Sequence, residues 1–215
     1  MACQIWIPQV DATIGVMAAV IVNPDKVREF KSAASFYQWL GRHHDKEEEL
    51  WIRIYKMGSG LKSITSKEAI DVVLCWGWID AVRKPLDEKS YLQRYSPRRS
   101  KSIWSQINVD NVARLVKEGR MTEHGLKPVE AAKADGRWDR AYARAKDMKI
   151  PDDLQTAIDA SPQARKMLQK LSAQNRFALA FRMHQIRTES GRRKKIVAFV
   201  DMLERGATIH PQRRK

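Results

Sequence analysis

The sequence lacks several features that would place it in a familiar class of protein. It contains only two cysteines among 215 residues, Cys3 and Cys75, so neither a disulfide-stabilised domain nor a cysteine-rich zinc site is expected. No apolar run reaches the roughly 18 residues of a transmembrane helix. The first residues have no basic segment, and Pro8 and Asp11 interrupt their apolar stretch, which is untypical of a signal peptide. We therefore expect a cytoplasmic protein.

The sequence also lacks the short motifs that identify common nucleotide-dependent and metal-dependent enzymes. It contains no G-x-x-x-x-G-K-[ST] loop, no G-x-G-x-x-G after a predicted strand and no H-E-x-x-H. The adjacent pair His43 and His44 falls in a predicted polar loop, but no further ligand has a suitable spacing, so no metal site is expected. No cofactor is expected either.

Positive charge, in contrast, is abundant. The formal net charge is +15, and it is concentrated towards the end of the chain. Residues 151–215 contain 14 Lys and Arg against 6 Asp and Glu, whereas residues 1–150 contain 26 against 19. Such a distribution predicts affinity for a polyanion such as nucleic acid, lipopolysaccharide or anionic lipid. Solubility alone is an equally good explanation of the charge.

Apolar periodicity and turn residues predict an α+β fold. Alternating residues predict strands at 50–57, 78–84 and 90–96, and a β-branched run at 18–22 is a candidate edge strand. We expect a small antiparallel sheet of three or four strands, packed with helices and followed by a helical C-terminal region. Capping residues and helical spacing predict helices at 32–40, 66–75, 102–118, 122–134, from Trp138 onward, and at 162–171, 172–184 and 192–205.

Four segments are expected along the chain. Residues 1–27 form an N-terminal extension, 28–149 the α+β core, 150–206 a basic helical region and 207–215 a basic tail. Residues 210–215 of this tail are expected to fray. The predicted helix at 102–118 has Ser102 as its N-cap. Its predicted buried residues are Trp104, Ile107, Val112, Leu115 and Val116.

The stretch from Cys75 to Asn108 combines tryptophans with a dense row of arginines. Arginine forks beside a helix N-terminus can hold a phosphate, sulfate or carboxylate. The predicted ligand-binding residues are Arg94, Arg98, Arg99, Ser102 and Asn108, with Trp78 and Trp104 as walls. The alternative is that the arginines pair with Asp80, Asp87 or Glu88 and lie over tryptophan rings.

Asp80 is the only candidate catalytic residue in this stretch, and a weak one. It lies on a predicted strand among apolar neighbours, where a carboxylate needs a partner or a shifted pKa. It could act as a general acid or base, but a structural acceptor for an arginine is the commoner role. A second basic cluster begins the last predicted helix and suits a nucleic-acid or membrane surface: Arg192, Arg193, Lys194 and Lys195.

An ordered series of motifs resembles the YdeI/OmpD-associated, or bacteriocin-protection, family. The series consists of Cys75-Trp76-Gly77-Trp78-Ile79-Asp80, Pro97-Arg98-Arg99 followed by Ser102-x-Trp104-Ser105 and Asn108, Asp135-Gly136-Arg137-Trp138, and Lys194-Lys195-Ile196. The resemblance covers roughly residues 28–206. It implies a bacteriocin-protection role or association with an outer-membrane porin, and it supplies no catalytic mechanism or cofactor.

Composition and resemblance together leave three functions open. The leading expectation is a non-enzymatic, cytoplasmic stress or envelope-protection protein that binds an anionic partner through a basic, tryptophan-bearing surface. The first alternative is a nucleic-acid-binding module centred on residues 192–195. The second alternative is an enzyme acting on a small anionic substrate, with Asp80 and the arginines in one pocket.

Overall fold

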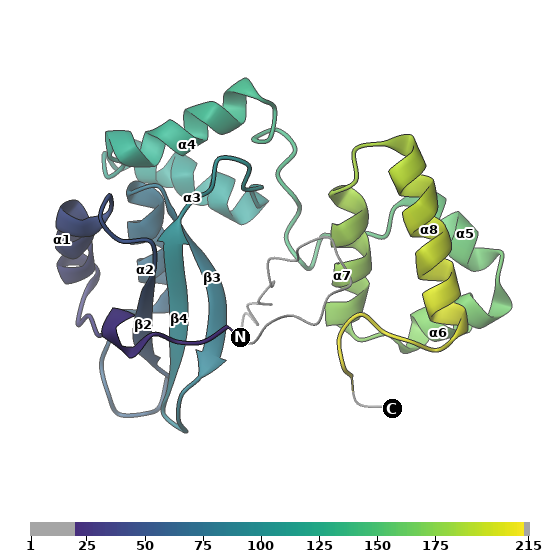
Figure 1. Ribbon diagram of the computed structural model, residues 1–215, viewed down its shortest axis with the longest axis horizontal. Helices are drawn as coiled ribbons and strands as arrows, with labels where there is room; N and C mark the ends of the chain where they lie inside the picture. Colours follow the sequence, from purple (N-terminus) through teal and green to yellow (C-terminus); the bar gives the residue numbers. More distant parts are fainter. Residues whose placement is uncertain (1–19, 213–215) are drawn as a thin grey trace. The chain divides into compact units, whose positions relative to one another are not determined.

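The computed structural model describes residues 20–212 and divides the chain into two compact units, up to Ala141 and from Tyr142 onward. The N-terminal unit combines a sheet with helices, whereas the regular structure of the C-terminal unit is helical (Figure 1). The expected α+β fold with a helical C-terminal region is therefore confirmed.

The sheet has four strands in the order β1-β2-β4-β3. Their bounds are β1 Val27–Arg28, β2 Leu50–Tyr55, β3 Trp78–Pro85 and β4 Ser90–Pro97. The β2–β4 and β4–β3 pairs are antiparallel as expected, but β1 pairs with β2 in parallel, so the sheet is mixed. The parallel pairing follows from the connection between these strands, which crosses over through a helix.

The edge strand differs in position from the one expected at residues 18–22. Residues 18 and 19 lie outside the part that the structure describes, and residues 20–22 are not in a strand. Asn23 instead caps a short 3-10 helix at Pro24–Lys26, and the strand follows it. The Asn-Pro pair thus starts a turn before the chain joins the sheet.

Four α-helices accompany the sheet: α1 Ala33–His43, α2 Ser66–Cys75, α3 Gln106–Lys117 and α4 Glu123–Ala134. Ser32, Thr65 and Thr122 are the N-caps of α1, α2 and α4, and Thr65 forms a capping box with Glu68. Helix α1 continues through Gly41, so the expected loop at His43 and His44 is wrong. His43 is the last residue of α1, where its ring stacks on Trp39 at 4.4 Å between centroids.

Two further predictions in this unit are wrong. Helix α3 is capped by Ser105, whose side chain accepts from the Asn108 N–H, rather than by Ser102. No helix forms around Trp138. The later start of α3 leaves Val112 and Leu115 buried but Ile107 and Val116 exposed, so the buried stripe is narrower than the apolar pattern suggests.

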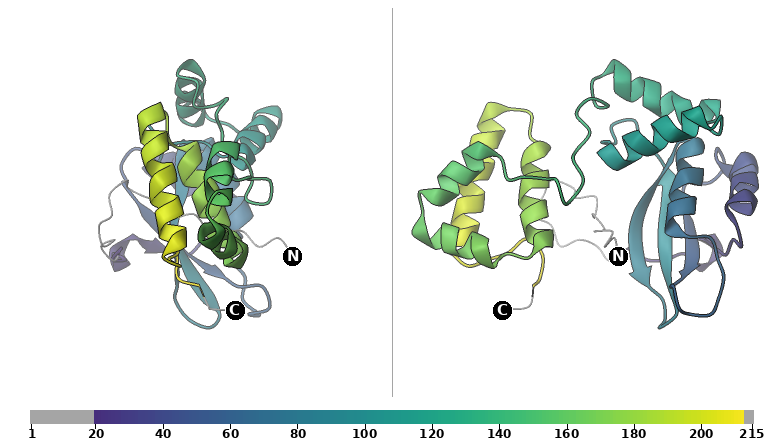
Figure 2. Two further views of the ribbon diagram at one scale, coloured as in Figure 1. Left: turned by 90° about the vertical axis from the view of Figure 1, so that its right-hand side faces the viewer. Right: turned by 180° about the vertical axis from the view of Figure 1, so that it is seen from behind.

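The core of the N-terminal unit has two parts. Helices α1 and α2 pack on one face of the sheet (Figure 2), where Phe36, Leu40 and Val72 contact the inward residues of the strands. Helices α3 and α4 pack with the end of α2 around Trp104 and Leu115. Trp78 belongs to the first cluster and Trp104 to the second.

The C-terminal unit contains α5 Asp152–Asp159, α6 Pro162–Lys170, α7 Ala173–His184 and α8 Glu189–Glu204. Ser161 and Ser172 cap α6 and α7, near the expected starts of these helices. Thr188 caps α8, so this helix begins earlier than the expected 192–205 and Gly191 lies inside it. The buried residues of the unit include Leu154, Leu179, Phe199 and Leu203.

Residues 210 and 212, at the start of the segment expected to fray, are hydrogen-bonded to the start of α7. The Asn175 side chain accepts from the His210 N–H at 2.8 Å and donates to the Gln212 side chain at 2.9 Å. Gln212 also accepts from the Ser172 N–H. These bonds satisfy a buried asparagine at the start of α7. Residues 213–215 lie outside the described part.

Two glycines, Gly77 and Gly125, allow the backbone at the end of α2 to lie close to the backbone at the start of α4. A Cβ on Gly125 would lie 2.2 Å from the carbonyl oxygen of Cys75, and a Cβ on Gly77 would lie 2.6 Å from that of His124. Thr122 donates to the same Cys75 oxygen through its N–H at 3.2 Å and its hydroxyl at 2.6 Å. We refer to this contact of Cys75, Gly77, Thr122 and Gly125 as the α2–α4 lock.

We predict that Gly125→Ala destabilises the protein by about 3 kcal/mol, because the new methyl group meets backbone that cannot move aside. Gly41→Ala is the control, since its Cβ would make only ordinary contact with the Trp76 ring. The control should be neutral or stabilising by up to about 1 kcal/mol, as alanine favours a helix interior. Urea unfolding measures both changes. Equal stability of the two variants would disprove the lock.

Candidate functional site

The stretch from Cys75 to Asn108 forms a helix end, a hairpin and a helix start in succession. Gly77 turns the chain with a positive φ of 73° and its carbonyl accepts from the Arg98 N–H at 2.9 Å, which closes the open end of the β3–β4 hairpin. Strand β3 has an irregularity between Asp80 and Arg83. Such bulges redirect side chains.

Arg98 is buried against Trp104 rather than open to a ligand. Its side chain and backbone leave only 9% of the residue exposed, and its guanidinium lies 3.7 Å from the Trp104 ring centre. A terminal nitrogen donates to the Ile103 carbonyl at 3.0 Å. Trp104 packs edge-on against Trp138 at 4.8 Å. This arrangement matches the alternative in which arginine lies over a tryptophan ring.

The other predicted ligand-binding residues lie in separate surroundings. Arg94 pairs with Glu49, with a nitrogen-to-oxygen distance of 2.6 Å, while Arg99 is exposed. The Ser102 carbonyl accepts from buried Arg137 at 2.8 Å. Trp78 is buried, and its ring nitrogen donates to the His44 carbonyl at 3.1 Å. The two tryptophans are thus buried in different clusters and do not face each other as walls.

Asp80 lies opposite Tyr95 on the neighbouring strand, so their side chains share the helix-covered face of the sheet. Burial raises the pKa of the Asp80 carboxyl, although its own N–H and the charges of Arg98 and Arg83 act in the opposite direction. Burial and the Asp80 charge likewise hold the pKa of Tyr95 well above its usual value. The Tyr95 hydroxyl is buried and has no hydrogen-bond partner within residues 20–212.

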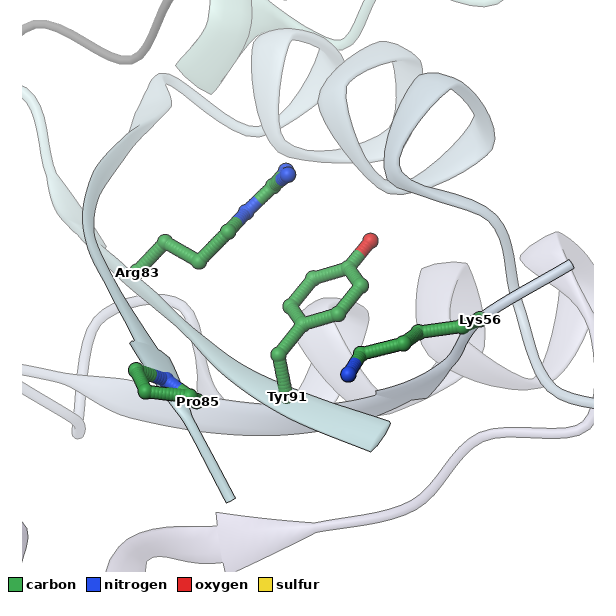
Figure 3. Close-up of a pocket in the computed structure, with 4 residues that line it drawn as sticks. All are labelled: Lys56, Arg83, Pro85 and Tyr91. Carbon is green, nitrogen blue, oxygen red and sulfur yellow. The ribbon is translucent and has the colours of Figure 1, made fainter. Parts of the chain in front are cut away.

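A pocket of about 460 Å³ lies at the end of the sheet where the β3–β4 hairpin turns (Figure 3). Its lining residues are Lys56, Arg83, Pro85 and Tyr91. We call this the sheet-end pocket. Both charged lining residues are cations, and Asp80 is not part of the lining. The pocket can therefore accept an anion, and it does not bring Asp80 together with a substrate.

Arg83 is held in this pocket by three contacts. Its Nε donates to the Gln93 side chain and one terminal nitrogen donates to Ser66, each at 3.0 Å. Its guanidinium lies 4.3 Å from the Tyr91 ring centre, and the Tyr91 hydroxyl is 2.7 Å from that of Ser66. The other terminal nitrogen has no hydrogen-bond partner within the described part of the chain. Arg83 is therefore fixed in position while keeping donors for a ligand.

Gln93 connects Arg83 to the bulge in β3. Gln93 is buried on the central strand β4, and its amide nitrogen donates to the Ala81 carbonyl at 3.0 Å. The Gln93 amide nitrogen thus bonds a carbonyl at the bulge, where the strand pairing is irregular, while the amide oxygen accepts from Arg83. Across the pocket, the Lys56 ammonium donates to the carbonyls of Asp87 and Glu88, at 3.3 Å and 3.0 Å.

The basic cluster of the last helix is partly neutralised. Arg192 pairs with Asp153 of α5 at 2.8 Å, which raises the pKa of Arg192. Arg193 contacts Glu189 one turn earlier. Lys195 lies 5.6 Å from the Phe199 ring centre. Within residues 20–212, Lys194 and Lys195 have no ion pair, so these two carry the free charge of the cluster.

Within residues 20–212, no group of three or more His, Cys, Asp or Glu side chains could hold a metal ion. None of the helices described is both long and apolar enough to cross a membrane.

Sequence reasoning missed the sheet-end pocket. Arg83 pairs with Gln93 and Pro85 pairs with Tyr91 across the hairpin, so Arg83 and Tyr91 are diagonal neighbours on one face of it. The alternation of residues in the sequence does not give this register. The polar side chain of Gln93 on a predicted strand is the one signal available in the sequence. A buried glutamine needs partners on both sides of its amide.

Comparison with known families matches two parts of the chain to different families. Residues 147–206 match the family described as bacteriocin-protection, YdeI or OmpD-associated, which confirms the resemblance for this part. Residues 28–128, which carry the sheet-end pocket, match a domain of unknown function, DUF8412. No curated protein and no solved structure matches the chain.

Cys75 gives a test of how firmly the centre of this unit is closed. Its side chain is fully buried, and burial raises the pKa of the thiol to about 11. We predict that Cys75, in a Cys3→Ser background, resists iodoacetamide at pH 8 and reacts in urea, because only the thiolate is nucleophilic. The unfolded thiol ionises first, so stability should fall as the pH rises from about 9 to 11. Rapid labelling of the native protein would contradict this.

Proposed function

We propose, from the match of residues 147–206 to the bacteriocin-protection, YdeI or OmpD-associated family, that this chain is a non-catalytic binding protein of that type. In this proposal it serves stress or envelope protection from the cytoplasm, and it holds an anionic ligand. The family match supports the type of protein. The choice of ligand rests on the sheet-end pocket, which lies in the other matched part of the chain.

One observation carries the choice of an anion: the charged side chains that line the sheet-end pocket are Lys56 and Arg83. A positioned guanidinium offers parallel N–H donors that suit a phosphate or carboxylate, and a lysine adds a point charge. Arg83 is fixed before a ligand arrives, which lowers the entropy cost of binding. The ligand class is therefore a phosphate or carboxylate with an apolar part that contacts Pro85 and Tyr91.

The enzyme alternative has less support. Catalysis by Asp80 would need a pocket that holds Asp80 and the arginines together, and the sheet-end pocket contains Arg83 without Asp80. Neither a histidine, a cysteine nor a carboxylate is among its lining residues. Binding without acid–base chemistry is the function that this lining favours.

We predict that Arg83→Ala weakens binding of phenyl phosphate at least about tenfold, since a hydrogen bond to a charged group contributes about 1.5–3 kcal/mol. Lys56→Ala should weaken it less, because a lysine contributes charge without a fork. Ligand-induced thermal stabilisation measures each affinity. Arg83→Lys keeps the charge and separates loss of the fork from loss of folding.

Arg99→Ala is the matched control for these variants. Arg99 is an exposed arginine outside the sheet-end pocket, and it belongs to the ligand-binding set expected from the sequence. Its removal should leave phenyl phosphate binding unchanged. If Arg99→Ala abolishes binding and Arg83→Ala does not, the ligand is held by the arginine row and the pocket proposal is wrong.

The nucleic-acid alternative is favoured by one observation, the free charges of Lys194 and Lys195 on α8. If this surface binds DNA or RNA, the logarithm of the affinity should fall linearly with that of the salt concentration. Replacing both lysines with glutamate should reduce that slope by about 2, one for each lost phosphate contact. Filter binding at several salt concentrations measures the slope. Affinity that does not respond to salt excludes this surface.

A further inference from the structure

We infer that the anionic ligand of the sheet-end pocket is carried by a lipid surface, and that the loops around the pocket contact that surface. This inference rests on the proposed function and names the source of its ligand. The contact surface consists of the β2–α2 loop, residues 56–65, and the β3–β4 turn, residues 86–89. We call it the loop surface.

Exposed apolar side chains gather on the loop surface. Met57 is fully exposed, and Leu61 and Leu86 are about half exposed. Single exposed apolar residues are common and need no explanation. Three on two adjoining loops are different, because water-exposed loop tips normally carry small or polar residues. Side chains of this kind enter the headgroup and acyl boundary of a bilayer.

The two loops adjoin each other at one end of the sheet. The Lys56 N–H donates to the Lys89 carbonyl at 2.8 Å, and the Lys56 ammonium reaches the carbonyls of Asp87 and Glu88. Figures 1 and 2 show both loops at the end of the sheet opposite α3 and α4. Nothing in α3 or α4 therefore separates this surface from a partner that approaches along the strands.

Charge on the loop surface favours anionic lipid. Lys56, Lys62 and Lys89 lie on these loops, and Arg83 lies in the pocket between them. Of the two carboxylates on the turn, Asp87 pairs with Arg53 at 2.7 Å, which leaves Glu88 as the opposing charge. Lysines at the surface of an anionic membrane are attracted to it. A lipid phosphate can then enter the pocket while its acyl chains remain beside Met57 and Leu86.

The same charges disfavour a second copy of the chain as the partner. A symmetric dimer through this surface would bring Lys56, Lys62 and Lys89 of one copy against those of the other. Like charges in an interface oppose association. An anionic bilayer suits both properties of the loop surface, because its acyl region accepts the apolar side chains and its headgroups attract the positive charge.

Cosedimentation of the full chain with vesicles tests the inference. The protein should bind vesicles of phosphatidylcholine with phosphatidylglycerol, and should not bind vesicles of phosphatidylcholine alone. The triple variant Met57→Ser, Leu61→Ser, Leu86→Ser should bind the anionic vesicles at least about tenfold more weakly, yet keep the affinity of wild type for phenyl phosphate. Val116→Ser, which replaces an exposed apolar residue on α3, is the control and should bind as wild type.

The outcomes separate this inference from the proposed function. Binding of phenyl phosphate without binding of anionic vesicles overturns the lipid inference alone. Vesicle binding that survives the triple variant but is lost in the Lys194→Glu, Lys195→Glu variant also overturns it, because α8 is then the contact. Failure of phenyl phosphate to bind overturns the pocket itself. If the triple variant also binds phenyl phosphate more weakly, its loops are misfolded. The single variants Met57→Ser, Leu61→Ser and Leu86→Ser then replace it, and unchanged vesicle binding by all of those that retain phenyl phosphate binding overturns the inference.

Discussion

The structure of the N-terminal unit depends on one backbone contact, the α2–α4 lock. The carbonyl of Cys75 at the end of α2 receives both donors of Thr122 and lies against Gly125. Any side chain at Gly125 would separate the two helices. The lock fixes where α2 ends and where Gly77 turns the chain, and Gly77 in turn holds Arg98 and closes the hairpin. The core around Trp104 is assembled on the same contact.

Gly77 and Arg98 fix the open end of the β3–β4 hairpin. The sheet-end pocket lies at the opposite end, where the hairpin turns. The bulge between Asp80 and Arg83 interrupts the register of β3 on β4. Gln93 satisfies the Ala81 carbonyl and receives Arg83 with the same amide. The position of a surface cation is therefore set by a buried polar group. Such coupling explains how a pocket with few lining residues can hold its guanidinium in one place.

Local features of the fold could be predicted from the sequence, and long-range ones could not. The helices at 66–75 and 122–134 are correctly predicted because their caps, Thr65 and Thr122, bond to a backbone N–H within three residues. Ser102 is the predicted cap of the next helix, but the structure has Ser105 in that role. The parallel edge strand at Val27–Arg28 depends on a partner more than twenty residues away. The role of Arg98 depends on its distance from Trp104, which the order of residues does not give.

Charge density was the strongest functional signal in the sequence, but the contacts of each cation decide whether it is available to a ligand. The densest cluster, on α8, gives two of its four charges to Asp153 and Glu189. In the arginine row, Arg94 pairs with Glu49 and Arg98 is covered by Trp104. Arg83 belongs to no cluster, and its hydrogen-bond partners, Gln93 and Ser66, are neutral groups. A cation held by amide and hydroxyl groups keeps the electrostatic attraction that a cation held by a carboxylate has already used.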